Sequence, residues 1–192
     1  MYGLLDPILH DASIVFTKAF YRRPLRIGST MMPDAGGRVT ELTVRPLINL
    51  LFPELSFFVQ PLAGEFAMLR QVAEQIPFSA GYAVDVGMLV DILYGYGLQS
   101  MAQVGMGERI HRNRDLHALS QEAFEICRCL LVKASMSKAQ TVALRGTLSR
   151  SLVQFSTIND EFVPARAKLN DHERPPIAAV SEYVLRHGIS KS

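Results

Sequence analysis

The spacing of hydrophobic residues predicts that helices and strands alternate along much of the chain. Apolar positions that recur every three or four residues indicate helices over 2–10, 41–51, 65–75 and 85–94. Short apolar runs indicate strands over 14–21, 57–60 and 101–104, and the segment before residue 41 is expected to be a loop. Residues 116–155 are predicted to be almost wholly helical, and residues 171–176 to form a rigid polar tail laid over a surface. Because strands alternate with helices, we expect an α/β sheet protein.

Composition narrows the class of protein. The chain has 192 residues, of which 48% are hydrophobic, enough for one well-filled globular domain. Its net charge of +2, from 20 basic and 18 acidic residues, argues against a nucleic-acid binder or a membrane-surface protein. We find no secretion signal and no apolar run long enough to span a membrane, so a cytoplasmic location is expected. Cys127 and Cys129 lie two apart on a predicted helix and face different ways, so we interpret both as reduced.

A glycine pair ahead of the helix at 41–51 predicts an anion site. Gly36 and Gly37 allow the backbone to adopt positive φ and to approach a ligand closely. The free N–H groups at the start of the following helix favour phosphate or carboxylate, and Arg38 and Thr40 add a guanidinium and a hydroxyl donor. The alternative is structural, with the glycines as an ordinary loop and Thr40 as the cap of an amphipathic helix.

A second segment suited to anions follows the strand at 101–104. Loops at the ends of strands are where α/β proteins bind ligands. Arg109 and Arg114 are suited to clamp a diphosphate, and His111 is suited to offer an imidazole nitrogen to a divalent metal. The alternative is a solvated basic loop in which His111 has no ligand role, because one histidine lacks the ligand cluster of a metal site.

Two further segments place glycines beside potential site residues. In residues 81–87, Asp85 begins an apolar helix, where a carboxylate can orient a sugar hydroxyl or stabilise positive charge at an anomeric carbon. Alternatively, Asp85 only stabilises the helix through its dipole. In residues 60–66, Gly64 can let a ligand approach the main chain, although a plain turn before a helix explains it nearly as well.

These four segments, in this order, resemble the second half of the glucosyl-3-phosphoglycerate synthases, which are retaining glycosyltransferases of the GT-A fold. The resemblance spans about residues 2–130 and includes FYRRP at 20–24, GGRVTEL at 36–42, QPLAGE at 60–65, GYAVDVG at 81–87 and GERIHRNR at 107–114. It implies an α/β fold with a partial GT-A-like, Rossmann-related mixed sheet, flanking helices and a helical C-terminal part. Residues 1–115 would form the acceptor-side portion of the glycosyltransferase domain, and residues 116–192 a helical C-terminal region and tail.

The resemblance also implies an activity and an acceptor site. Glucose would be transferred with retention from a nucleoside diphosphate glucose, usually the uridine form, to 3-phosphoglycerate, with Mg²⁺ or Mn²⁺ as cofactor. A homodimer formed through the helical C-terminal part would fit the family. The acceptor loop would consist of Gly37, Arg38, Val39 and Thr40, and Asn113 would also reach the acceptor.

The remaining roles implied by the resemblance concern the donor. Arg109 and Arg114 would hold the diphosphate, and His111 would ligate the metal. Leu62 and Gly64 would line the sugar pocket. Asp85 matches the position near the transferred glucose where the family usually has Glu, so its side chain is one methylene shorter.

The resemblance further implies a preceding segment of similar length that carries the donor-binding strands and an Asp-x-Asp metal motif. No Asp-x-Asp occurs in these 192 residues, so His111 would lack carboxylate partners for the metal. We therefore expect that this chain alone does not transfer glucose and that it exposes a sheet edge favouring self-association. Two hypotheses remain, namely the acceptor-binding portion of a glucosyl-3-phosphoglycerate synthase, or a non-catalytic homologue that binds a phosphorylated metabolite or a partner chain.

Overall fold

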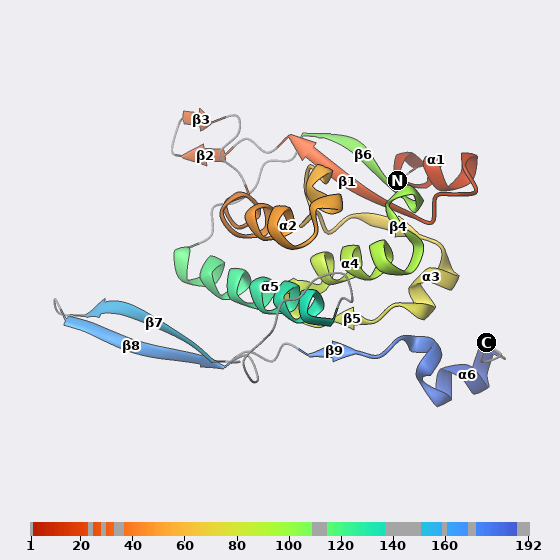
Figure 1. Ribbon diagram of the computed structural model, residues 1–192. Coiled ribbons are helices and arrows are strands. Elements are labelled where there is room, and N and C mark those ends of the chain that lie inside the picture. The colour runs from red at the N-terminus through yellow and green to blue at the C-terminus, as the bar shows by residue number, and fades with distance from the viewer. Residues whose placement is uncertain are drawn as a thin grey trace.

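One three-stranded sheet, with the strand order β4-β1-β6, organises the fold in the computed structural model of the protein (Figure 1). The structure describes residues 2–22, 25–27, 30–32, 37–108, 115–136, 151–158, 161–168 and 172–187. The middle strand β1 (Phe16–Arg22) runs parallel to β6 (Met101–Glu108) and antiparallel to β4 (Phe66–Met68). This pairing confirms the mixed sheet that was predicted.

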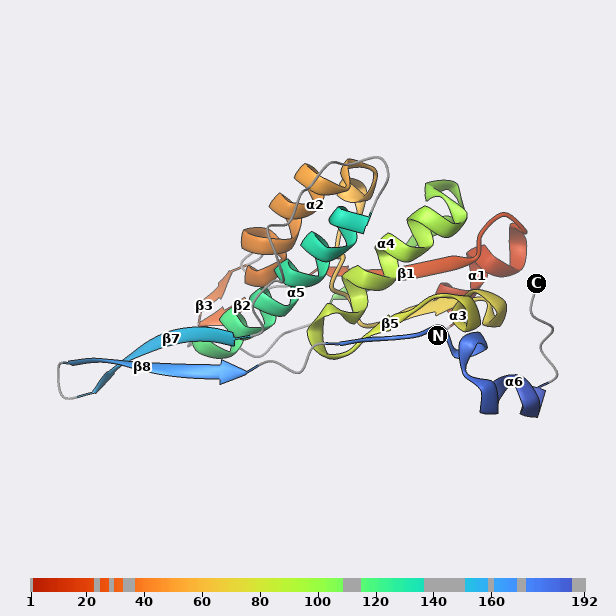
Figure 2. The ribbon, with the colours of Figure 1, turned by 60° about the horizontal axis from the view of Figure 1, so that its bottom comes forward.

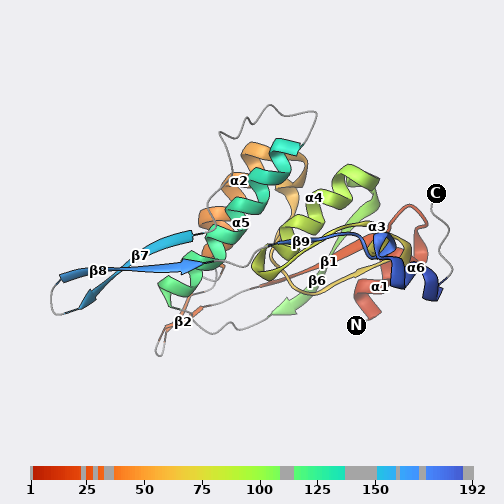
Figure 3. The same cartoon turned by 90° about the horizontal axis from the view of Figure 1, so that it is seen from below.

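Helices cover both faces of this sheet. Helix α1 (Tyr2–His10) packs on one face, where the Thr17 hydroxyl donates a hydrogen bond of 2.5 Å to the Leu4 carbonyl oxygen. The opposite face carries the larger helical layer, which can be followed in Figure 1 and Figure 3. This layer consists of the π-helical turn η1 (Thr40–Val44) with α2 (Arg45–Leu51), α4 (Val84–Tyr96) and α5 (Leu116–Met136).

The hydrophobic core lies between the sheet and the larger helical layer. Strand β1 is buried on both faces, and its Phe16, Thr17 and Lys18 are all fully buried. Helix α5 packs against α4 and α2, so it belongs to the same core as the sheet. Burial of these apolar side chains is the main favourable term in folding. The core includes Phe16, Val44, Ile48, Phe52, Leu55, Val72, Val86, Leu89, Ile92, Ile126 and Leu130.

Short elements link the sheet to the helices. Strands β2 (Leu25–Ile27) and β3 (Thr30–Met32) form a hairpin, and α3 (Arg70–Gln75) follows β4. Single turns of 3-10 helix complete this part of the chain, namely η2 (Pro53–Phe57), η3 (Gly81–Ala83) and η4 (Leu98–Ser100).

The C-terminal part adds a projecting hairpin and a segment that returns to the body. Strands β7 (Ser151–Ile158) and β8 (Glu161–Lys168) pair along their whole length and extend away from the helices, as Figure 2 shows. Strand β9 (Glu173–Arg174) then pairs antiparallel with β5 (Phe78–Ser79). The chain continues through η5 (Ile177–Ala179) into α6 (Ser181–His187). The predicted tail therefore does lie over a surface of the body.

The predicted helices at 2–10, 41–51 and 85–94 and the strands at 14–21 and 101–104 are confirmed within a few residues. The predicted strand at 57–60 is wrong. There the Gln103 side chain takes the place of a neighbouring strand, because its amide accepts the Val59 N–H over 2.7 Å and donates to the Phe57 carbonyl oxygen over 2.9 Å. The apolar run therefore forms η2 and an extended segment fixed by one side chain.

Two helix predictions and one loop prediction need correction. The helix predicted at 65–75 begins only at Arg70, because residues 66–68 pair with β1 as strand β4. The helix predicted at 116–155 ends at Met136, and residues 151–155 belong to β7. The β-branched and aromatic residues of β7 suit a strand better than a helix. The loop predicted before residue 41 contains the β2–β3 hairpin.

Candidate active site

Asp85 forms a buried ion pair with Lys18 at the start of α4. Asp85 lies in the first turn of α4, and its Oδ1 atom is 2.7 Å from the Nζ atom of Lys18 on β1. The side chains of Lys18 and Asp85 are 1% and 16% exposed, respectively. The bond holds the carboxylate toward the sheet, so Asp85 does more than stabilise the helix dipole. Removing one partner of such a pair is strongly unfavourable, because the other charge is left without compensation.

Lys18 is the site residue that sequence reasoning missed. Its Nζ atom lies 5.8 Å from the centroid of the Phe66 ring, which occupies the paired position on β4. This distance allows a cation–π interaction in addition to the ion pair. The signal that could have found Lys18 is a single lysine inside an apolar strand run, because a lysine is rarely buried unless it is paired.

The predicted acceptor loop begins at a left-handed glycine. Gly37 has a φ of 82°, a conformation that residues with a side chain rarely adopt. Glu41 donates its backbone N–H to the Gly37 carbonyl oxygen over 3.0 Å, so helical structure begins directly after this glycine. Val39, not Thr40, occupies the N-cap position of η1, and no side chain caps it. Thr40 is 3% exposed. The alternative in which Thr40 caps the helix is therefore wrong.

Arg45 connects the acceptor helix to the segment that leads into QPLAGE. Its guanidinium donates two hydrogen bonds to the Glu41 carboxylate, one of 2.7 Å from Nε and one of 3.0 Å from Nη2. The bond to Glu41 raises the pKa of Arg45 above its ordinary value. The same guanidinium donates to the Val59 carbonyl oxygen over 2.9 Å. One charged side chain thus fixes the GGRVTEL and QPLAGE segments relative to each other.

The QPLAGE segment runs alongside β1. Gln60 is 8% exposed. Its side-chain oxygen accepts the Tyr21 N–H over 3.1 Å, and its side-chain NH₂ group donates to the Tyr21 carbonyl oxygen. Ala19 donates its backbone N–H to the Glu65 carbonyl oxygen over 2.9 Å. Since Ala19 follows Lys18, the segment with Leu62 and Gly64 lies next to the strand that carries the ion pair.

Leu62 and Gly64 differ in their surroundings. Leu62 is half-buried and packs against the hydrophobic core. Gly64 is exposed, and a Cβ atom placed on it would meet no atom of the described residues within 4 Å. Packing within the chain therefore does not require a glycine at this position, which leaves room for a ligand beside the main chain.

Residues 109–114 of the second segment suited to anions lie outside the described residues. This applies to all four predicted site residues in it, namely Arg109, His111, Asn113 and Arg114. The described part of the chain contains no cluster of three or more His, Cys, Asp or Glu side chains that could hold a metal ion. The diphosphate and metal roles therefore remain predictions.

A second buried lysine binds the other carboxylate of α4. The Nζ atom of Lys133 on α5 lies 2.8 Å and 2.9 Å from the two Asp91 carboxylate oxygens and 2.6 Å from Glu173 Oε1. Burial raises the pKa of Asp91 to about 6. Burial opposes the charge on Lys133, but Asp91 and Glu173 outweigh this effect and raise the pKa of Lys133. Gly87 allows the close approach, because a Cβ there would lie 2.7 Å from Ser79 Oγ and 3.3 Å from the Lys133 side chain.

The curated relatives that match this chain carry the same name, although no family model matches the chain. The chain is 39% identical over 183 residues to the glucosyl-3-phosphoglycerate synthase of Petrotoga mobilis, covering 95% of this chain and 56% of that protein. It is 37% identical to the glucosyl-3-phosphoglycerate synthase of Mycolicibacterium smegmatis, covering 92% and 55%. The chain is a homologue of the glucosyl-3-phosphoglycerate synthases. It spans about half the length of these curated relatives.

Solved structures of similar proteins confirm the GT-A-like fold of this glucosyl-3-phosphoglycerate synthase homologue. Mannosyl-3-phosphoglycerate synthase from Rubrobacter xylanophilus matches with a TM-score of 0.80 and 39% identity, covering 93% of this chain and 55% of that one. Glucosyl-3-phosphoglycerate synthase from Mycobacterium tuberculosis, in complex with Mn²⁺, uridine diphosphate glucose and phosphoglyceric acid, matches with a TM-score of 0.73 and 32% identity, covering 92% and 53%. No helix in the described part of this chain has the length and apolar character needed to cross a bilayer.

Proposed function

We propose that the chain is the acceptor-side, C-terminal portion of a glucosyl-3-phosphoglycerate synthase, which transfers glucose from uridine diphosphate glucose to 3-phosphoglycerate with retention. The observation that carries this proposal is the connected site. Lys18 bonds Asp85 to β1, and Gln60 bonds the QPLAGE segment to β1. Arg45 bonds the helix that starts after Gly37 to Val59, which directly precedes QPLAGE. The complex of the Mycobacterium tuberculosis relative with uridine diphosphate glucose and phosphoglyceric acid supports the choice of substrates.

The acceptor would bind at the start of the helix after Gly37. 3-Phosphoglycerate carries a phosphate and a carboxylate, and both groups suit backbone N–H groups and a guanidinium. Gly37, Arg38, Val39 and Thr40 would supply these donors, and Asn113 is also proposed to reach the acceptor.

The donor sugar would lie between Asp85 and the QPLAGE segment. Asp85 would stabilise the positive charge that develops at the anomeric carbon, and Lys18 would hold its carboxylate in place. Leu62 and Gly64 would line the sugar. The positioning role of Lys18 also accounts for a carboxylate one methylene shorter than the Glu that is usual in the family, because the ion pair fixes where the charge lies.

The diphosphate and the metal would be held outside the described residues. Arg109 and Arg114 are proposed to bind the diphosphate, and His111 is proposed to ligate Mg²⁺ or Mn²⁺. Structures of the Mycobacterium tuberculosis relative contain Mn²⁺ or Mg²⁺ together with uridine diphosphate. The described residues of this chain do not form such a site by themselves.

The second candidate function is a non-catalytic homologue that binds a phosphorylated metabolite or a partner chain. We also propose a cytoplasmic homo-oligomer and a division of the chain near residue 115. Among the described strands β6 pairs only with β1, which leaves its other edge for a further strand.

A chimeric enzyme distinguishes the two candidates. This chain would replace the matching segment of the Petrotoga mobilis glucosyl-3-phosphoglycerate synthase, and product formation from uridine diphosphate glucose and 3-phosphoglycerate would be measured with Mg²⁺ or Mn²⁺. We expect glucosyl transfer by the chimera and none by the 192-residue chain alone, because catalysis requires donor and acceptor to be held together. A folded chimera that lacks transfer, beside a parent active with its own donor, would favour the non-catalytic candidate.

Binding of the acceptor can be tested on the chain itself. We expect Arg38→Ala to weaken 3-phosphoglycerate binding by about 1.5 to 3 kcal/mol, the range for a hydrogen bond to a charged group. Isothermal titration calorimetry measures this change, and the exposed Lys168→Ala serves as a control for loss of one positive charge. Unchanged affinity in Arg38→Ala would exclude the assignment of the acceptor loop.

A further inference from the structure

A groove lies where the C-terminal segment meets α3 and β5. It encloses about 770 Å³ and is lined by side chains from residues 70–78 of the body and 174–186 of the C-terminal segment. We call it the C-terminal groove. A volume of this size is typical of small-molecule sites. None of the predicted acceptor, donor or metal residues lines it, so its ligand does not follow from the proposed function.

Much of the wall of the C-terminal groove is apolar and open to water. Ala73 and Phe78 contribute from the body, and Pro175, Ile177 and Val180 contribute from the C-terminal segment. Ile177 is 40% exposed and Val180 is 41% exposed. Covering these side chains with the apolar part of a ligand would be favourable, because it removes hydrocarbon surface from water.

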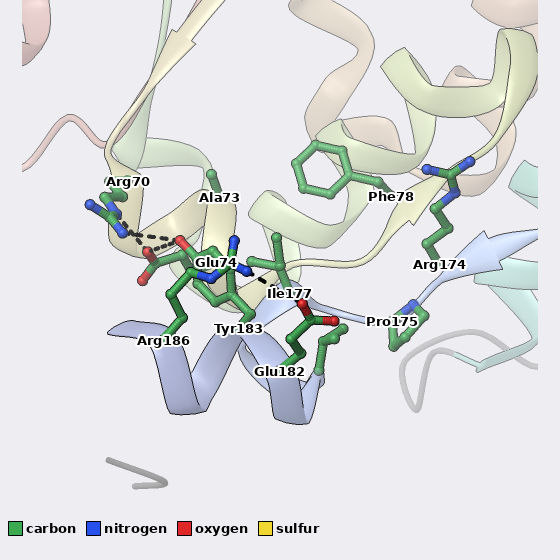
Figure 4. Close-up of a pocket in the computed structure, with 11 residues that line it drawn as sticks. Arg70, Ala73, Glu74, Phe78, Arg174, Pro175, Ile177, Glu182, Tyr183 and Arg186 are labelled. Atoms are coloured by element: carbon green, nitrogen blue, oxygen red, sulfur yellow. Dashed lines mark hydrogen bonds and ion pairs between the residues drawn. The ribbon is translucent and has the colours of Figure 1, made fainter. Parts of the chain in front are cut away.

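Among the described residues, the charges around the C-terminal groove leave one cation uncompensated. Arg70 Nε lies 2.6 Å from Glu74 Oε1, and Arg186 Nη2 lies 3.5 Å from Glu182 Oε1. Within the described part of the chain, the Arg174 side chain forms neither an ion pair nor a hydrogen bond. Figure 4 shows Arg174 beside Phe78 at one end of the pocket, away from the paired Arg70 and Glu74.

The wall from the C-terminal segment is already fixed without a ligand. The Tyr183 hydroxyl donates a hydrogen bond of 2.7 Å to Glu74 Oε1, and Arg70 Nη2 lies 3.0 Å from the same hydroxyl oxygen. Strand β9 adds its backbone pairing with β5. A groove that exists before binding costs little ordering entropy when a ligand enters.

From these observations we infer that the C-terminal groove binds a small amphipathic carboxylate, with its apolar acyl or aryl body against Phe78 and Ile177 and its carboxylate on Arg174. A carboxylate matches the planar fork of an arginine, which can donate two parallel hydrogen bonds. The single cation left uncompensated among the described residues suits one negative charge. A sugar phosphate fits less well, because its hydroxyl groups would face apolar side chains without hydrogen-bond partners.

Calorimetry on the 192-residue chain tests the inference with matched probes and variants. Decanoate is the probe, and decanol is the uncharged match with the same apolar body. Arg174→Ala removes the cation, Arg174→Lys keeps the charge without the fork, and Ala73→Leu places a bulkier side chain in the apolar part of the groove without changing any charge. Lys168→Ala, an exposed lysine outside the groove, controls for the loss of surface charge.

We expect one saturable decanoate site, with decanol binding at least about tenfold more weakly and Arg174→Ala losing at least about tenfold in affinity, as expected for a charge-assisted hydrogen bond. Arg174→Lys should lose less than Arg174→Ala, Ala73→Leu should abolish binding, and Lys168→Ala should bind like the unchanged chain. Equal binding of decanoate and decanol, or full affinity in Arg174→Ala or Ala73→Leu, would overturn the inference. Circular dichroism of each variant establishes that it is folded, and Arg174 is exposed, so its replacement should not disturb packing.

Discussion

Helix α4 carries two carboxylates, and each meets a buried lysine in a different setting. Asp85 meets Lys18 of β1, beside the segments that resemble a glycosyltransferase site. Asp91 meets Lys133 of α5, which also binds Glu173 of β9. The second cluster therefore connects two helices and the returning C-terminal segment. A buried lysine–carboxylate pair does not by itself identify an active site; the neighbouring segments decide whether a ligand can reach it.

The largest expected effect follows from removing the lysine of the cluster formed by Lys133, Asp91 and Glu173. Lys133→Met should destabilise the chain by about 3 to 5 kcal/mol, because Asp91 and Glu173 would be left facing each other without a cation. The free energy of unfolding in urea measures this change. Lys168→Met on β8, where the lysine is exposed, should change it by less than about 0.5 kcal/mol. A similar small change in Lys133→Met would show that the cluster does not stabilise the fold.

Variants of the Lys18–Asp85 pair should distinguish an effect on turnover from an effect on stability. In the chimera, Asp85→Asn should lower turnover at least about 100-fold, the scale for losing one electrostatic contact in a transition state. It should also destabilise the chain, because Lys18 is left buried without its carboxylate. The double variant Lys18→Met with Asp85→Asn should regain much of that stability without regaining turnover.

Two comparisons complete the test of the Lys18–Asp85 pair. Asp85→Glu should keep activity, since the charge remains and the family usually has Glu there. Turnover that returns together with stability in the double variant would mean that Asp85 has only a structural role. Steady-state kinetics measures turnover, and urea unfolding of the same variants measures the free energy of unfolding.

Local patterns predicted the long elements and the glycine at the acceptor loop, but not the contacts that assemble the site. Helix α4 was found from its apolar run, and the positive φ of Gly37 was expected from the glycine pair. The strand β4 was missed, because its three residues become a strand only by pairing with β1. Lys18 and Asp85 are 67 positions apart, and no local pattern joins residues at that separation.

The resemblance contributed what pattern could not. It singled out Asp85, while composition and spacing left a plain helix-start carboxylate equally open. The Lys133 cluster and the C-terminal groove were not foreseen by either route, because both depend on where β9 pairs. In such cases the sequence shows charged residues, and only the fold shows which of them are compensated.

Asp91 should also make the stability of the chain depend on pH. Burial raises the folded-state pKa of Asp91 from 3.8 to about 6, so the folded state holds this proton more tightly than the unfolded state. Its contribution to stability is therefore greatest below about pH 4 and falls by about 2 to 3 kcal/mol as the pH rises to about 6. Lys133 stays protonated throughout this range and adds no slope.

Unfolding free energies of the chain and of Asp91→Asn between about pH 4 and pH 7 isolate this contribution. Other carboxylates titrate in both proteins, so the difference between the two curves reports Asp91. The free energy of unfolding of the unchanged chain should fall relative to that of Asp91→Asn as the pH rises. Parallel curves would show that Asp91 titrates as it does in the unfolded chain.

The smallest expected effect concerns two glycines beside the proposed sugar site, Gly81 and Gly64. They differ in how much space a side chain would find there. Gly81 has a φ of 72°, and a Cβ there would lie 2.6 Å from Glu125 Oε2, whose carboxylate accepts the Tyr82 N–H over 2.9 Å. Gly81→Ala should therefore cost about 1 to 3 kcal/mol of stability through backbone strain and contact. At Gly64, no atom of the described residues lies within 4 Å of such a Cβ, so Gly64→Ala should change stability by less than about 0.5 kcal/mol.

If Gly64 lies beside the donor sugar, the added methyl group occupies space that only the ligand uses. In the chimera, Gly64→Ala should then raise KM for uridine diphosphate glucose several-fold, with the free energy of unfolding unchanged. A variant with both quantities unchanged would return Gly64 to an ordinary turn residue. Because no neighbouring atom of the described chain restricts this position, any kinetic effect of one methyl group would have to come from the ligand.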